Sequence, residues 1–328
     1  MHRSAWYRRG VRVTAVAAAV VLLLAGCGKK SSTTALKLRA GGNDPNDRSI
    51  AILAFLPSSM TVKVGATVTW TVTGPEPHTV TFVPAGSPPP SPSDPNASKA
   101  VGPTGTFDPA QKISSGFLGL PGGPDSFKLK FATAGNYTYY CHIHPTMIGK
   151  LTVTTGDGEA EKTIVDNGKA ELARYIKEGR AAKQKLLASV ATPKTNKDGS
   201  KTWTVEMGAG TAHTAILSFA PVPANIKKGD KVVFVNNSGE PHTASFAGKT
   251  TLPQVPESPA AMRPTGKSPL TLNATAFLNT GWLPPDAPPG SVPLAARTFT
   301  FNVPTAGTFA YVCLLHQGSG MTGTIVAS

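Results

Sequence analysis

Two of the three cysteines in this 328-residue chain begin short segments whose side chains could hold a metal ion. One segment reads Cys-x2-His-x2-Met and the other reads Cys-x2-His-x4-Met. A lone histidine lies far upstream of each segment, and both upstream histidines stand in a Glu-Pro-His-Thr sequence. Each set therefore offers one thiol, two imidazoles and one thioether, from His78, Cys141, His144 and Met147 in the first set and from His242, Cys313, His316 and Met321 in the second.

This combination of donors is typical of a copper ion that cycles between Cu(I) and Cu(II). Two imidazoles and a thiolate in a near-trigonal plane, with a weak thioether on the axis, suit both oxidation states. Zinc usually takes a further cysteine, histidine or carboxylate and has no use for a thioether. A single Cys-x2-His is a weak signal, because an isolated methionine near it is more often part of a core. The repetition of the whole set favours copper in both places.

The two ligand sets belong to two copies of one unit. Residues 51–55 read Ala-Ile-Leu-Ala-Phe and residues 215–219 read Ala-Ile-Leu-Ser-Phe, and each segment leads without a gap to its upstream histidine. The same number of positions therefore separates Ala51 from Ala215 and the first upstream histidine from the second. An agreement of this length indicates an internal duplication.

Short runs of alternating apolar residues predict an all-β fold for both copies. The alternation from Val62 to Val72 is typical of extended chain, and Cys141 continues another alternation after Tyr139, so its side chain should leave the strand toward the core. Glycine- and proline-rich turns between such runs favour an antiparallel sandwich. We expect one domain over residues 48–156 and a second over residues 201–328.

A helical linker is predicted between the copies, within residues 157–200. Apolar residues recur at helical spacing from about Ile164 to Val190 among Ala, Lys and Glu, and Pro193 ends the run. Gly179 weakens this prediction. We expect the helix to pack against one sandwich.

Both copies resemble the cupredoxins, the family of small blue-copper proteins. The first loop is similar to that of amicyanin and the second to those of plastocyanin and pseudoazurin. The resemblance implies two tandem Greek-key β-sandwiches, one type 1 copper ion in each, and electron transfer as the function. In the family an asparagine often follows the upstream histidine and ties its loop to the cysteine loop, whereas Thr79 and Thr243 stand here. We therefore expect unusual tuning of the reduction potentials, and two distinct potentials because the loops differ in length.

The N-terminus predicts a bacterial lipoprotein. Residues 1–26 contain four arginines, an apolar run too short for a membrane span, and Leu-Ala-Gly before Cys27. This is the pattern of a lipoprotein signal peptide, after which Cys27 would carry the lipid. Residues 27–47 should then form a flexible tether, and the mature chain should be anchored outside the cytoplasm, on the periplasmic or cell-surface side of the membrane.

The charge of the chain favours a partner other than nucleic acid. The formal net charge of +14 falls to about +10 without the signal-peptide arginines, which suits anionic lipid or an acidic redox protein. No cluster of Lys and Arg interleaves with aromatic residues, so we expect no nucleic-acid binding.

The ligand sets predict a membrane-tethered electron carrier that exchanges electrons with a cytochrome, oxidase or reductase. The alternative is a relative of two-domain multicopper oxidases or copper nitrite reductases. Those enzymes need extra histidines, one of them immediately before the cysteine, where Tyr140 and Val312 stand. A copper storage or delivery protein is a third alternative, although it would favour exposed clusters of Met and His.

Electrons are expected to enter or leave through His144 and His316, which should lie near solvent among apolar residues. His142 should point to the solvent side, and together with Tyr140 it is a further candidate for electron access. His142 and His213 could also form an extra metal site, although a lone histidine such as His213 is more often structural.

Overall fold

The computed structural model describes residues 35–328 except 92–93, 95, 224, 254–258 and 287–289. The described residues form one compact unit. The predicted signal peptide, Cys27 and the first part of the predicted tether lie outside the described residues. In the part of the chain that is described, no helix is both long and apolar enough to cross a membrane.

Strands dominate both repeats, as the alternating apolar pattern predicted. The first repeat contains β1 (Ala35–Asp44), β2 (Asp47–Leu56), β3 (Ser59–Lys63), β4 (Thr67–Val72), β5 (Thr81–Phe82), β6 (Ala100–Val101), β7 (Gly105–Thr106), β8 (Ile113–Ser115), β9 (Ser126–Lys130), β10 (Gly135–Tyr140) and β11 (Ile148–Thr154). The second contains β13 (Lys201–Thr211), β14 (Thr214–Ala220), β15 (Lys231–Val235), β16 (Ser245–Phe246), β17 (Leu270–Thr271), β18 (Leu278–Asn279), β19 (Thr298–Asn302), β20 (Gly307–Val312) and β21 (Thr322–Ala327). The remaining elements are α1 (Glu161–Leu187), β12 (Lys194–Thr195), α2 (Pro259–Met262) and the 3-10 turns η1 (Leu294–Arg297) and η2 (Gln317–Ser319).

One sheet runs through both repeats. Its strand order is β17-β19-β15-β13-β14-β2-β1-β4-β9-β7, with β12 paired to β13. The repeats join where β2 pairs antiparallel with β14, and Ala51 lies opposite Ala215 there. These two alanines occupy equivalent positions in the duplication. The direct pairing of equivalent residues places a local two-fold axis between β2 and β14.

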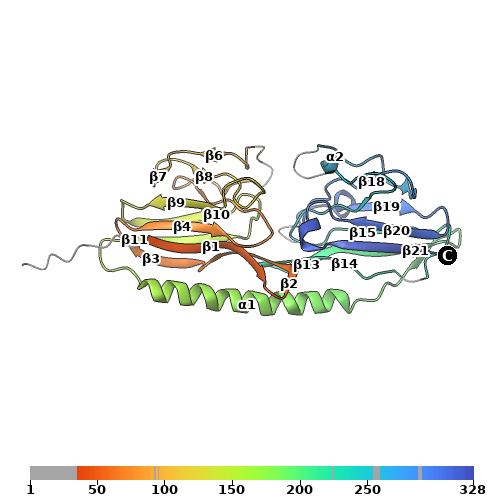
Figure 1. Cartoon of the computed structure of the whole chain (residues 1–328), viewed down its shortest axis with the longest axis horizontal. Coiled ribbons are helices and arrows are strands. Elements are labelled where there is room, and N and C mark those ends of the chain that lie inside the picture. The colour runs from red at the N-terminus through yellow and green to blue at the C-terminus, as the bar shows by residue number, and fades with distance from the viewer. Residues whose placement is uncertain (1–34, 92–93, 95, 224, 254–258, 287–289) are drawn as a thin grey trace, which may run out of the picture. The chain divides into compact units, whose positions relative to one another are not determined.

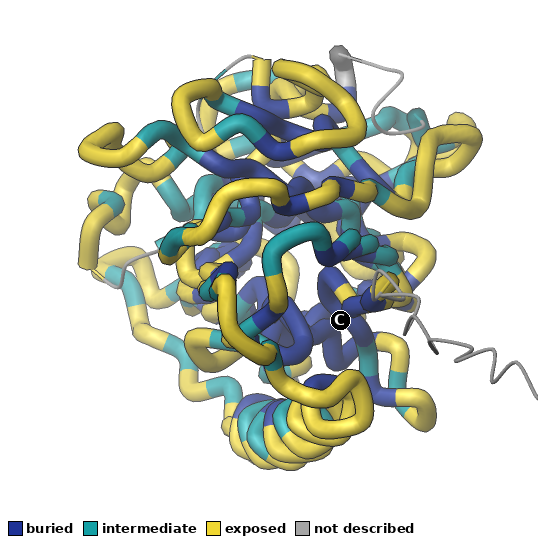
Figure 2. The backbone as a smooth tube through the Cα atoms, turned by 90° about the vertical axis from the view of Figure 1, so that its left-hand side faces the viewer, coloured by how far each residue is buried: buried dark blue, intermediate teal, exposed yellow. Residues whose placement is uncertain are grey.

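Each repeat closes its sandwich with a second, smaller sheet. The order is β3-β11-β10-β5-β8-β6 in the first repeat and β18-β16-β20-β21 in the second. The side chains between the sheets form two cores rich in aromatic residues, whose largest buried members include Trp70, Phe82 and Tyr139 in one and Phe234 and Tyr311 in the other. Figure 2 shows buried stretches of backbone surrounded by exposed loops.

The helix α1 packs against strands of both repeats, so the expectation that it contacts one sandwich is wrong. Tyr175 of α1 shares a buried cluster with Ile50 of β2 and Ile216 of β14, and Figure 1 shows α1 running beneath both halves of the long sheet. Gly179 permits this close approach, because a Cβ there would lie 2.4 Å from Ile50 Cγ2. The glycine that weakened the helix prediction therefore serves the packing.

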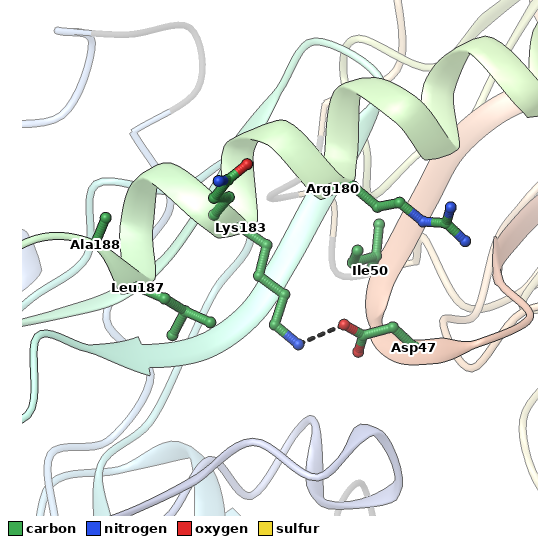
Figure 3. A pocket seen from close by; sticks show the side chains of 7 residues that line it. Asp47, Ile50, Arg180, Lys183, Leu187 and Ala188 are labelled. Atoms are coloured by element: carbon green, nitrogen blue, oxygen red, sulfur yellow. Dashed lines mark hydrogen bonds and ion pairs between the residues drawn. The ribbon is translucent and has the colours of Figure 1, made fainter.

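Ion pairs fasten α1 to the β1–β2 hairpin. The Arg180 guanidinium contacts the buried Asp44 carboxylate at 2.6 and 2.9 Å, and Lys183 pairs with Asp47. Figure 3 shows Lys183 and Asp47 in a surface pocket between α1 and β2. None of the residues that line this pocket belongs to a predicted ligand set.

The prediction of a flexible tether is wrong for the residues from Ala35 onward. Residues in that range form β1, which pairs with β2 and β4 and buries Leu36, Leu38 and Ala40 in the first core. The alternation of these three apolar residues with polar ones is the signal of a half-buried strand.

Candidate metal centres

Each predicted ligand set is assembled from two loops at equivalent places in the repeats. His78 follows β4 and His242 follows β15, and each lies in an isolated antiparallel bridge. Cys141 comes directly after β10, and Cys313 directly after β20. Both cysteines are free thiols and are buried, as the alternation along β10 predicted.

In the first centre, the structure brings three predicted ligand atoms into contact. His78 Nδ1 lies 3.0 Å from His144 Nδ1, and Cys141 Sγ lies 3.8 Å and 3.4 Å from these two nitrogens. Donor atoms that share one metal ion at about 2.0–2.3 Å are separated by about 3–4 Å. The spacing of the three donors therefore fits a single ion between them.

The second centre repeats this geometry. The two Nδ1 atoms lie 3.1 Å apart, and the sulfur lies 3.7 Å and 3.3 Å from them, in the set His242, Cys313 and His316. All six side chains of the two clusters are buried. The agreement within 0.1 Å between corresponding distances shows that the duplication preserved the site as well as the fold.

The two predicted methionines close the cysteine loops. Met147 and Met321 are fully buried. The Cys141 amide donates to the Met147 carbonyl at 3.0 Å, and the Cys313 amide donates to the Met321 carbonyl at 2.9 Å. The longer second loop takes up its extra residues in the 3-10 turn η2, and Gly320, in the left-handed region, follows as its C-terminal cap. Loops of different length therefore deliver the same cluster.

A threonine after each upstream histidine ties the two loops of its centre together. The Thr79 amide donates to Cys141 Sγ at 3.3 Å, and the Thr79 Oγ1 accepts from the His142 amide at 2.7 Å. The same two contacts recur at Thr243, at 3.4 Å and 2.8 Å. Threonine thus reaches across the loops here, and its amide stabilises the thiolate form of the cysteine.

Two glycines that the sequence reasoning missed support the upstream histidines. Gly41 lies at a bulge in the β1–β2 pairing with φ of +76°, and Gly208 lies at a bulge between β13 and β14 with φ of +89°. An added Cβ would lie 2.0 Å from His78 Nε2 in the first case and 2.8 Å from His242 Nε2 in the second. Glycine allows the backbone to lie directly against each imidazole.

The outer edges of the two loop histidines face the opposite repeat. His144 Nε2 lies 3.0 Å from Glu240 Oε1, and His316 Nε2 lies 3.3 Å from Glu76 Oε2. Each histidine is only 3% exposed. The expectation that these histidines lie near solvent is therefore wrong, because the repeat interface covers them.

The electrostatics of the first centre favour the metal-binding form of its cysteine. Burial raises the pKa of Cys141, but the imidazoles of His144 and His78 outweigh it and hold that pKa well below its ordinary value. Burial lowers the pKa of His144, whereas Glu240 and the cysteine raise it more, so the net pKa lies well above its usual range. The thiolate is the form that binds a metal.

The remaining predicted residues lie in different surroundings. His142 is 1% exposed, with its Nε2 3.5 Å from Asp94 Oδ2, so the solvent-side expectation is wrong. Tyr140 is half-buried. His213 packs against Tyr175 of α1, with ring centroids 4.6 Å apart. Among the described residues, no group of three potential metal ligands includes His142 or His213.

Comparison with known proteins identifies the class. Residues 45–154 match the copper binding proteins of the plastocyanin/azurin family. The chain is 32% identical over 122 residues to plastocyanin of Scenedesmus fuscus, an alignment that covers 37% of this chain and 95% of that protein. It is 29% identical over 112 residues to plastocyanin of Capsella bursa-pastoris, covering 34% and 89%.

Two solved structures are similar to part of the chain about the length of one repeat. Plastocyanin of Dryopteris crassirhizoma is 30% identical and covers 36% of this chain and 99% of its own, with a TM-score of 0.24. An oxidized mutant of amicyanin is 25% identical, covering 37% and 82%, with a TM-score of 0.24.

Each repeat is a sandwich of two sheets with a buried His-Cys-His cluster held by two loops. These features define two tandem cupredoxin domains. The chain belongs to the plastocyanin/azurin family of copper-binding proteins, and the predicted resemblance and all-β fold are confirmed.

Proposed function

We propose that this chain is an electron-transfer protein that holds one blue copper ion in each repeat and is tethered by a lipid on Cys27 to the outer side of a bacterial cytoplasmic or outer membrane. Bound copper would supply a one-electron redox couple in each centre. The ligands would be His78, Cys141, His144 and Met147 in the first repeat, and His242, Cys313, His316 and Met321 in the second.

The observation that carries this proposal is the repeated, buried His-Cys-His cluster. A carrier works best when its ligands move little between oxidation states. The backbone bonds that close each cysteine loop, and the threonine that ties it to the histidine loop, hold the donors in place. The relatives named above are plastocyanins, which makes electron transport the function that best fits the sites.

The structure favours the carrier over the two alternatives. A copper storage or delivery protein needs ligands that release metal easily, whereas His78, Cys141 and Met147 are at most 2% exposed. An oxidase or nitrite reductase needs a further copper of another kind. The one additional donor group in the described residues, Glu76 with Glu240 and His316, shares its only histidine with the second centre.

A redox partner would reach the first centre from a side other than the covered loop histidines. Tyr140 is bonded directly to Cys141 and lines a pocket with Phe82, Phe107 and Tyr137. We place electron access at this pocket, which aromatic and polar side chains line together. The basic charge of the chain favours an acidic cytochrome, oxidase or reductase as the partner.

Metal analysis with a visible spectrum tests the function. The full chain should bind two coppers, both intensely blue, and Cys141→Ser and Cys313→Ser should each remove one copper and about half of the colour. A third, non-blue copper would contradict the carrier, and ready loss of copper to a mild chelator would favour storage. Cys27→Ala should move the protein from the membrane to the soluble fraction.

A further inference from the structure

Two glutamates that belong to neither ligand set lie buried between the centres. Glu76 and Glu240 are 6% and 3% exposed, and a carboxylate oxygen of each lies within 4.8 Å of the other and of a ring nitrogen of His316. Burying two carboxylates side by side costs free energy unless proton donors or cations face them. The Nε2 edges of His144 and His316 are those groups.

Each of the two glutamates contacts a loop histidine of the opposite repeat. A histidine that binds metal through Nδ1 usually donates its other ring N–H to a carboxylate. Here the carboxylate for His144 comes from Glu240 of the second repeat, and the carboxylate for His316 comes from Glu76 of the first. Each repeat therefore completes the surroundings of the other repeat's centre, as the two-fold axis between β2 and β14 requires.

Each glutamate is also joined by covalent bonds to the centre of its own repeat. In Glu240-Pro241-His242 a single proline separates the carboxylate residue from the upstream histidine ligand. A path from the first centre to the second thus runs through the His144 imidazole, one contact of 3.0 Å, and three covalently linked residues.

A second path runs in the opposite sense. It leaves the second centre through His316, crosses one contact of 3.3 Å to Glu76, and continues through Pro77 to His78. Electron transfer slows steeply with each gap between non-bonded atoms. Each path contains only one such gap, of 3.0 Å in the first and 3.3 Å in the second.

We propose that these crossed Glu-Pro-His segments carry electron exchange between the two centres, so that the chain works as one coupled pair instead of two independent carriers. The step oxidises one copper from Cu(I) to Cu(II) and reduces the other by the same electron. No bond forms or breaks. The inference rests on the proposed function, because it requires copper in both repeats.

The test follows the exchange directly in the full chain loaded with copper. Met321→Gln would replace the predicted thioether ligand of the second centre, which should separate the two potentials and the two absorption bands. A soluble photoreductant then delivers less than one electron per chain, and the redistribution between the bands is recorded. We expect a redistribution rate that does not depend on protein concentration.

Removing both carboxylates should slow this exchange. Glu76→Ala with Glu240→Ala should reduce the rate by about 10- to 100-fold, while the paired Gln variants, which keep a polar contact, should retain most of it. Glu206→Ala is the control, because Glu206 contacts Asn237 instead of a ligand histidine. The blue colour of each variant reports that its centres are intact.

A second measurement tests whether each glutamate acts on the centre of the opposite repeat. In the Cys313→Ser chain, which would hold copper only in the first repeat, Glu240→Gln should shift the reduction potential more than Glu76→Gln. A larger shift from Glu76→Gln would overturn the proposal, and so would an exchange rate proportional to protein concentration or unchanged by the alanine pair. Absence of copper or of blue colour would instead refute the proposed function.

Discussion

Replacing Thr79 by valine should weaken copper binding at the first centre alone. Thr79 is fully buried, and its Oγ1 accepts the His142 amide at 2.7 Å. Valine keeps the shape of the side chain and removes this acceptor. Water cannot take its place in a site without exposed surface. The hydroxyl of Thr81 loses one neighbour but keeps Ser114 at 3.0 Å, so the loss concentrates on the His142 amide.

The expected loss of copper affinity follows from the His142 amide, which would be left without an acceptor. A buried donor without a partner costs about 1–3 kcal/mol, and the change loosens the loop that carries the thiolate. Supporting contacts of this kind usually change metal affinity about 10- to 100-fold. Competition between the protein and a Cu(I) chelator of known affinity measures the change, in the Cys313→Ser background so that one centre is observed.

Two further variants make the result decisive. Thr79→Ser restores the hydroxyl and should recover most of the affinity. Thr243→Val, measured in the Cys141→Ser background, should weaken the second centre by a similar factor because Thr243 makes the same contacts. If Thr79→Val binds copper as tightly as Thr79→Ser, the threonine hydroxyl does not hold the two loops together.

Three other predictions concern a glycine beside the first centre, an ion pair of α1 and the reduction potentials. Gly41→Ala should abolish copper binding in the first repeat, because its Cβ would collide with the His78 imidazole. Gly86→Ala is the control, since Gly86 also has a positive φ but open space around it, and its replacement should cost only backbone strain. Metal analysis of both variants separates the collision with the ligand from the backbone strain. Arg180→Ala should destabilise the fold by about 1–2 kcal/mol at neutral pH, since it leaves the Asp44 carboxylate buried without its cation, whereas Arg174→Ala, which breaks an exposed pair, should cost less. The hydrogen bond from Arg180 holds the pKa of Asp44 below its ordinary value, so this stabilisation is present above about pH 4 and fades as the pH falls through the lowered folded pKa; thermal melts of parent and variant should therefore converge in acid. Spectroelectrochemistry should resolve two reduction potentials, and a single shared potential would contradict the expectation from loop length.

The ligand clusters were predictable because three of the four ligands in each set lie in one short segment and the whole set occurs twice. The spacing after each cysteine places three donors on one turn, and the duplication removes the ambiguity of a single motif. Strand alternation likewise predicted that Cys141 points inward. The alternation from Val62 to Val72 was interpreted as a single stretch of extended chain. The structure has two strands there, β3 and β4, and the alternation continues through the turn at Gly65 that separates them.

The contacts between the repeats were not predicted, because they depend on how two surfaces meet. One signal was present in the sequence. The run from Ile50 to Leu56 is apolar at every position, and every one of these residues is buried, since one face of β2 meets the cores and the other meets α1. A continuous apolar run of this length is typical of a strand covered on both faces.

The two-fold arrangement explains why a glutamate precedes each upstream histidine in the same way. An interface between equivalent surfaces repeats every contact, so one Glu-Pro-His sequence, duplicated with the rest of the unit, produces two crossed carboxylate–imidazole contacts. The loop histidine edges that could have met a partner are then closed off, and the centres face each other. A substitution at either glutamate should therefore act mainly on the centre of the opposite repeat, so each centre is adjusted by a residue that the other repeat supplies.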